Sequence, residues 1–315
     1  MRIFKLLLFF LTFICIGYFV YEYEEKLSLL KEISISNLLV LLVIGFLIQA
    51  LQSFPFYLVT RILHKNFSFL NAFYITTISS MYNQILPLNS GGIAVRAALI
   101  NRKYKLSWDK ITAILSVFYF TGYYAISVLL IVLSALFTFF YSQEIKFFNT
   151  LLAFFILLNA FLLLFIKYKQ LLNFKWKVVV FLSKIIETSK LFLKEKDKVI
   201  YNMLSQIVIV FVMAVKLYCS FLFLGLEVDF WKIFFIQTLL ALSLVFSITP
   251  GDLGVKEGIV ILFTGLIGLS PENILFATLL DRITSVIVVF LLGLLSKYLY
   301  LRGFKSPIED PQLAN

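Results

Sequence analysis

Long apolar runs, separated by short loops rich in lysine, are the feature of this sequence that most limits its fold. Several runs approach the roughly 20 residues that a helix needs to cross a bilayer. Charged residues make up only 14% of the chain, whereas soluble domains carry roughly a quarter. A soluble protein with 61% hydrophobic residues would expose too much apolar surface to stay dispersed. The runs therefore predict an all-α polytopic membrane protein.

The net charge of +11 does not indicate a nucleic-acid partner, because the lysines lie in the loops between apolar runs. This distribution follows the positive-inside rule for cytoplasmic loops. It predicts about six full transmembrane helices, with both termini in the cytoplasm. The predicted crossings are Leu6–Tyr21, Leu38–Leu58, Ile111–Tyr141 (with a bend at Gly122), Phe148–Ile166, Val199–Leu224 and Leu275–Leu295.

Two further apolar segments are broken by proline, glycine and polar residues. The breaks contain Pro87, Asn89, Gly91 and Gly92 in the first segment, and Pro250, Gly251, Asp252 and Gly254 in the second. The arms on either side are Phe69–Leu86 and Ile93–Ile100, then Ile233–Ser247 and Gly258–Leu269. Irregular backbone at membrane depth is tolerated only where protein or a watery cavity covers it. We expect two re-entrant helical hairpins, the first entering from the cytoplasm and the second from outside.

The order of elements repeats along the chain. Pro87 and Pro250 are related by an offset of 163 residues, and the same offset relates Gly91 to Gly254. Each half then contains three crossings and one hairpin, so the second half is inserted in the opposite orientation. We expect one membrane domain, 1–315, with inverted halves 1–141 and 148–300, a basic amphipathic cytoplasmic loop 167–198 and a tail 301–315. Transporters with inverted repeats bind their substrates near the midplane, beside broken helices.

Charged side chains inside the apolar segments are the candidates for that substrate site. A charge at the bilayer centre costs about 2.5 kcal/mol or more, so it usually faces a partner or a cavity. The candidates are Arg96, Lys216, Lys256, Glu257, Asp281 and Arg282. Together with Asp252 they provide a slight excess of positive charge. This excess would suit a phosphate or another anionic head group.

Other roles for these residues stay open at the level of sequence. Asp281, Arg282 and Lys256 could form internal pairs that only lock helices together. Lys216 could extend toward the outer interface, and Arg96 could be a cytoplasmic anchor. Glutamines in the apolar runs more often join helices than bind ligands; they are Gln49, Gln52 and Gln206.

The residues around the two breaks resemble a known family. Pro250–Gly258, with Arg282 in the next helix, resembles the Pro-Gly-Gly-x-Gly-x-Arg-Glu signature of the lysylphosphatidylglycerol synthase transmembrane-region family. Pro87–Gly92 followed by Arg96 resembles its upstream element. The likeness extends from about Leu38 to the last crossing. Lys256 stands in place of the family's arginine, Asp252 in place of a glycine, and Ile93 where an acidic residue is common.

The resemblance implies a flippase-like domain in the cell inner (plasma) membrane, similar to the flippase portion of the multiple peptide resistance factor. Its partners would be membrane lipids: an anionic or aminoacylated phospholipid, or a polyprenyl-phosphate-linked lipid. An alternative is a scaffold or accessory subunit for a cell-envelope lipid or glycan enzyme. A membrane transferase is a third reading, although the sequence contains no evident catalytic constellation. We expect no enzyme activity, no cofactor and no metal.

Overall fold

The structure is a computed structural model, which describes residues 33–86, 90–140, 149–150, 153–154, 156–157, 195–243, 252 and 254–302. All regular secondary structure in these residues is helical, which confirms the predicted all-α class for the described part of the chain. The helices are α3 (Ile35–Leu63), α4 (Phe69–Ile85), α5 (Ser90–Tyr104), α6 (Trp108–Phe140), α9 (Lys196–Leu222), α10 (Phe230–Ser243), α11 (Val255–Leu262), α12 (Thr264–Ile267) and α13 (Pro271–Arg302).

Four of these helices are long and apolar enough to cross a membrane: α3, α6, α9 and the span Pro271–Tyr300 of α13. A helix rises 1.5 Å per residue, so each reaches about 40 to 50 Å, beyond the roughly 30 Å of a bilayer's hydrocarbon core. Large apolar side chains on their outer sides, such as Val43 and Leu291, are exposed. Because lipid rather than water suits such a surface, the chain is an integral membrane protein.

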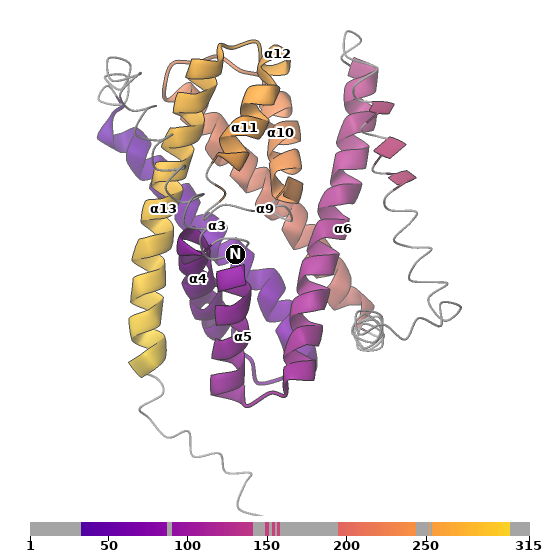
Figure 1. The fold of residues 1–315 in the computed structure, drawn as a ribbon, viewed down its shortest axis with the longest axis vertical. Coiled ribbons are helices and arrows are strands. Elements are labelled where there is room, and N and C mark those ends of the chain that lie inside the picture. Colours follow the sequence, from indigo (N-terminus) through magenta and orange to yellow (C-terminus); the bar gives the residue numbers. More distant parts are fainter. Residues whose placement is uncertain are drawn as a thin grey trace, which may run out of the picture.

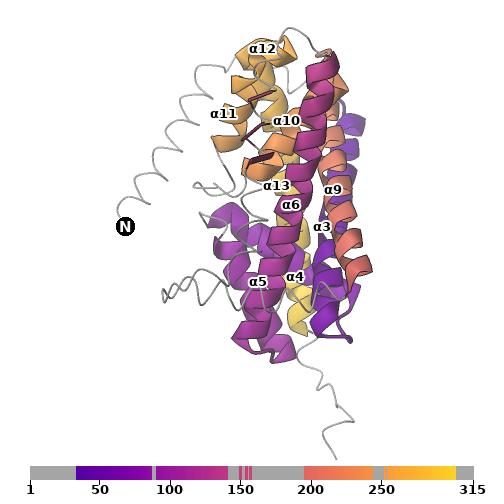
Figure 2. The ribbon, with the colours of Figure 1, turned by 90° about the vertical axis from the view of Figure 1, so that its right-hand side faces the viewer.

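The remaining helices are shorter and lie in two groups (Figures 1 and 2). Helices α4 and α5 occupy the lower half of the molecule, and α10, α11 and α12 occupy the upper half. The long helices α6 and α13 run through both halves beside them. The end of α4 and the start of α5 face the middle of the molecule, as do the end of α10 and the start of α11. The two groups therefore approach each other from opposite ends.

Local sequence explains where several of these short helices begin. Ser68 caps α4, because its Oγ accepts a hydrogen bond from the backbone N–H three residues later at 3.3 Å. The N–H of Gly92 donates to Oδ1 of Asn83 at 2.6 Å, which ties the first turn of α5 to α4. Before α11, Gly254 has a left-handed backbone with φ of 81°, and its N–H donates to Glu257 at 2.9 Å.

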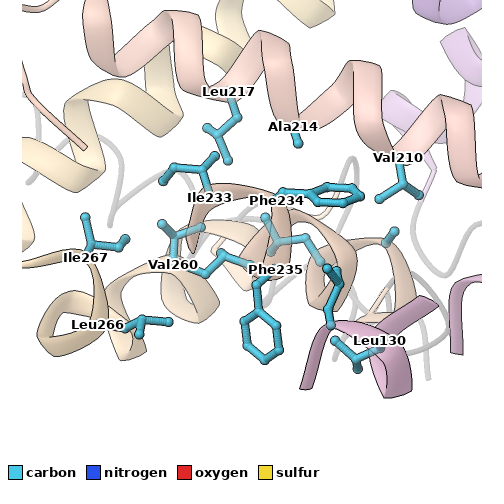
Figure 3. Packing of buried hydrophobic residues seen from close by; sticks show 14 of the residues in the cluster. Leu130, Val210, Ala214, Leu217, Ile233, Phe234, Phe235, Val260, Leu266 and Ile267 are labelled. Atoms are coloured by element: carbon cyan, nitrogen blue, oxygen red, sulfur yellow. The ribbon is translucent and has the colours of Figure 1, made fainter. Parts of the chain in front are cut away.

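The two larger of the three apolar clusters in the described residues lie one in each half of the bundle. Figure 3 shows the upper cluster, in which side chains of α9, α10, α11 and α12 meet Leu130 of α6. Its labelled members are Leu130, Val210, Ala214, Leu217, Ile233, Phe234, Phe235, Val260, Leu266 and Ile267. The lower cluster joins α3, α4, α5, α6 and α13 through buried residues that include Phe56, Ile75, Ile100, Ile114 and Tyr300. The polar residues described below lie between the two.

The helices differ from the predicted bounds in ways that have physical reasons. Helix α13 begins at Pro271 rather than Leu275 and continues to Arg302. Hydropathy marks only the apolar part of a crossing, whereas backbone hydrogen bonding extends into polar turns. The arm predicted as Gly258–Leu269 is two helices, which are interrupted at Phe263.

Three of the glycines predicted at bends or breaks lie within helices. Helix α6 is a single helix across Gly122, where a Cβ atom would lie 3.3 Å from the side chain of Gln206. Gly91 and Gly92 lie in the first turn of α5 rather than in the break. A Cβ on Gly92 would clash with the side chain of Asn83. These glycines therefore serve close packing, which a sequence cannot distinguish from a bend or a break.

Several predictions fall outside the described residues. They concern the crossing Leu6–Tyr21, most of Phe148–Ile166, nearly all of the basic loop 167–198 and nearly all of the tail 301–315. Of the predicted break residues, Pro87, Asn89, Pro250 and Gly251 also lie outside them. The layout of six crossings and two re-entrant hairpins therefore stays a prediction.

Candidate functional site

A cavity of about 360 Å³ lies between the short helices and the long ones. Side chains from α3, α4, α5, α6, α9, α10 and α13 line it, together with Asp252 and Lys256. This volume falls within the range of roughly 300–1,000 Å³ that small-molecule sites occupy. Five of the six predicted substrate-binding residues line the cavity, and Glu257 contacts Arg282, which is one of them.

Arg96, on α5, is the buried cation with the fewest hydrogen-bonding partners. It is only 6% exposed, and its Nη1 donates to the hydroxyl of Tyr119 at 3.3 Å. Its guanidinium lies 4.7 Å from the ring centroid of Phe56 and 4.9 Å from that of Phe118. Its Nε has no hydrogen-bond partner, and Arg96 forms no ion pair within the described part of the chain. Aromatic rings attract the cation but leave donors available for an oxyanion.

The ammonium group of Lys216, on α9, forms all of its hydrogen bonds with residues of α13. Its Nζ donates to Oδ1 of Asp281 at 2.9 Å and to the backbone oxygen of the same residue at 2.6 Å. It also contacts the hydroxyls of Thr284 at 2.9 Å and Ser285 at 2.8 Å. An ammonium has three protons, so these four acceptors saturate it. At 1% exposure, Lys216 does not extend to an interface as one alternative supposed.

Lys256, at the start of α11, shares the Asp281 carboxylate with Lys216. Its Nζ pairs with Oδ2 of Asp281, while Lys216 occupies Oδ1. The side chain of Lys256 is 20% exposed, and that carboxylate is its one partner in the described residues. Lys256 therefore retains donors that Lys216 does not have.

Arg282 and Glu257 form a separate ion pair beside this group. Nε of Arg282 lies 2.6 Å from Oε1 of Glu257, and Nη2 donates to Oε2 at 3.1 Å. Nη2 also donates to the backbone oxygen of Asp252 at 2.9 Å. Arg282 thus fastens α13 to the chain just before α11. The carboxylate atom Oδ1 of Asp252 is buried and has no hydrogen-bond partner.

The charges of these residues do not cancel. Arg96, Lys216, Lys256 and Arg282 carry four positive charges against three negative charges on Asp252, Glu257 and Asp281. The ion pairs are those expected if charged residues only lock helices together, and for Lys216 and Arg282 the contacts agree with that reading. They do not account for Arg96, which lies in the cavity rather than on the surface as a cytoplasmic anchor would.

Amide side chains were the signal that sequence reasoning undervalued. The sequence favoured interhelical hydrogen bonds for Gln49, Gln52 and Gln206. All three instead line the cavity, and none of their side chains has a hydrogen bond within the described part of the chain. Two more glutamines, Gln84 and Gln237, line it in the same way. Uncharged amides within apolar runs could have identified the cavity, because hydrocarbon disfavours them unless they face a polar space.

The described residues contain no group of three histidine, cysteine, aspartate or glutamate side chains that could hold a metal ion. The groups that converge on the cavity are instead cations, carboxylates, amides and hydroxyls. Such a set can bind an oxyanion through Arg96 and Lys256 and can hydrogen-bond uncharged polar groups beside it.

Membrane-length helices around a buried polar cavity define the class: this is a polytopic helical membrane protein. The chain belongs to the family described as the lysylphosphatidylglycerol synthase TM region, which it matches over residues 2–293. The resemblance seen at the two breaks is thereby confirmed.

A UPF0104 membrane protein of Methanothermobacter thermautotrophicus is 32% identical to the chain over 85 residues, which are 27% of this chain. The match spans 24% of that relative's own length. No solved structure matches the chain.

Proposed function

We propose that this protein moves a lipid with an anionic head group between the two leaflets of the membrane by alternating access. The observation that carries the proposal is Arg96, a buried guanidinium that faces the cavity and has no carboxylate partner among the described residues. A buried, uncompensated cation is costly in a membrane. An anionic ligand would remove that cost, whereas the other cations are already paired.

The arrangement of the short helices supports a route across the membrane. Arg96 lies on α5 and Lys256 on α11, and these two helices belong to short-helix groups that approach the middle of the molecule from opposite ends (Figure 1). A head group bound by both cations would contact both groups of short helices at once. Movement of one group relative to the other would expose the head group to one side at a time, while the acyl chains remain in lipid.

We infer the finer architecture from the same order of elements. The series α3–α6 and the series α9–α13 each begin and end with a long helix, with two short helices between them in the first series and three in the second. This order supports an inverted repeat of six crossings and two re-entrant hairpins. The lysine distribution and the family favour a cell inner membrane location with cytoplasmic termini.

Translocation of labelled lipids in proteoliposomes tests the proposal. We expect Arg96→Gln to slow the movement of an anionic phospholipid by about 10- to 150-fold, because a hydrogen bond to a charged group contributes roughly 1.5–3 kcal/mol. Arg96→Lys retains the charge and should lose less. Arg61→Gln is the matched control, since Arg61 is an exposed arginine that contacts Tyr57 at the end of α3.

Two results would count against the proposal. Unchanged transport by a folded Arg96→Gln variant would remove Arg96 from the site. If no lipid moved with the folded wild-type protein, the scaffold function would be favoured, and replacement of the basic loop 167–198 would then be the informative variant.

A further inference from the structure

The cavity contains more uncommitted hydrogen-bonding groups than an anion alone requires. Gln49 on α3 is 6% exposed and Gln237 on α10 is 2% exposed, and neither side chain has a hydrogen-bond partner among the residues that the structure describes. Thr76 and Asp252 also line the cavity, and the hydroxyl of Thr76 and the carboxylate atom Oδ1 of Asp252 are buried without a hydrogen-bond partner in the described part of the chain. Buried polar groups of this kind are normally satisfied. Their convergence on one space points to a ligand that satisfies them.

We propose that the transported lipid carries a neutral, hydroxyl-rich head group attached to its phosphate, such as a glycerol, inositol or glycosyl group. The inference deepens the proposed function and rests on it. Arg96 would bind the phosphate, and the amides of Gln49 and Gln237 would bind the hydroxyls beside it. Each amide offers both a donor and an acceptor, which matches the two-way hydrogen bonding of a hydroxyl.

The chemistry of the lining disfavours a cationic head group. Asp281 is occupied by two lysines, and Glu257 is paired with Arg282. Among the described residues that line the cavity, Asp252 is then the one carboxylate without an ion-pair partner, and a net positive charge surrounds it. Neutral amides cannot compensate the positive charge of an ammonium group on the lipid. They can, however, distinguish a head group with hydroxyls from one without, because a hydrogen-bonding site rejects an analogue that leaves its polar groups unpaired.

Three phospholipids of equal charge provide the test: phosphatidylinositol, phosphatidylglycerol and phosphatidylethanol, each with a fluorescent acyl chain. All three are phosphodiesters with one negative charge, and phosphatidylethanol lacks hydroxyls on its head group. In proteoliposomes we expect phosphatidylinositol to move fastest and phosphatidylethanol slowest. A neutral hydrogen bond corresponds to about a two- to tenfold effect, so two such bonds predict a difference of roughly five- to 100-fold.

The double variant Gln49→Leu/Gln237→Leu should abolish the preference for phosphatidylinositol over phosphatidylethanol. It retains side-chain volume, so we expect the variant to move phosphatidylinositol and phosphatidylethanol at the same rate. Thr238→Val is the matched control. Thr238 is buried on the same helix as Gln237, but its hydroxyl donates to the backbone oxygen of Phe234 within that helix, at 2.8 Å.

A second measurement needs no variant. Inositol 1-phosphate should raise the melting temperature of the detergent-solubilised wild-type protein more than ethyl phosphate does, because ligand binding to the folded state stabilises it. Equal protection by the two compounds, or equal transport of the three lipids, would overturn the inference while leaving the transport function intact. Selective protection without any lipid movement would instead support the hydroxyl-binding site and contradict transport, so a soluble polyol phosphate would become the ligand.

Discussion

The group formed by Lys216, Asp281 and Lys256 predicts an unequal response to the loss of its members. Asp281→Asn leaves Lys216, at 1% exposure, as a buried cation without a counter-charge. Breaking a buried pair in this way costs about 3–5 kcal/mol of the free energy of unfolding. Lys216→Met is milder, because Asp281 keeps its pair with Lys256. The loss is then one charge-assisted hydrogen bond, roughly 1.5–3 kcal/mol.

The double variant Lys216→Met/Asp281→Asn tests whether the uncompensated charge, rather than the number of lost contacts, determines the loss of stability. It removes the buried cation together with its counter-charge and leaves Lys256, whose side chain is 20% exposed and can be hydrated. We therefore expect the double variant to be more stable than Asp281→Asn alone. Unfolding by sodium dodecyl sulfate in mixed micelles, followed by circular dichroism, measures the three free energies, and the double-mutant cycle gives their coupling.

Two outcomes would refute the argument. If Lys216→Met were as destabilising as Asp281→Asn, the pairing of Asp281 with Lys256 would not be protective. If the two single losses simply added in the double variant, the buried ion pair would not be what holds α9 against α13.

Gly293→Ala should destabilise the protein by about 1–3 kcal/mol, because a Cβ atom there would lie 2.6 Å from the side chain of Met81 on α4. Gly258→Ala is its control in the same micelle unfolding assay, since a Cβ on Gly258 would meet nothing within 4 Å; equal effects would contradict the close approach of α4 and α13. Asp252 has a left-handed backbone with φ of 59°, so Asp252→Gly should be more stable than Asp252→Ala by roughly 1 kcal/mol in that assay. Equal stabilities of those two variants would show that the backbone at residue 252 is not strained.

Much of the architecture could be predicted because its signals are local. The length of an apolar run decides whether a helix crosses a bilayer, and the runs that became α3, α6, α9 and α13 were identified with errors only at their ends. A single proline or glycine does not interrupt every helix, since Pro55 lies within α3 and Gly122 within α6. Clusters of proline, glycine and polar residues do so more reliably, and the interruptions between α4 and α5 and between α10 and α11 were visible from them. The family signature around Lys256 was local in the same sense and was confirmed by the match over residues 2–293.

The hydrogen-bond and ion-pair partners of the individual polar residues could not be predicted, because these partners depend on which helices are neighbours at a given depth. Lys216 and Asp281 are 65 residues apart, and nothing in the apolar run around Lys216 indicates that four acceptors on α13 surround it. Arg96 has a similar apolar setting in sequence, yet rings from α3 and α6 surround it, and no carboxylate of the described residues pairs with it.

Composition thus sets how many costly polar groups enter the membrane. Helix packing alone sets which of them satisfy one another and which, like Arg96 and Gln237, are left facing the cavity. The physical reason is that insertion depends on the hydrophobicity of each segment by itself, whereas hydrogen bonds and ion pairs act over a few ångströms between segments that only folding brings together.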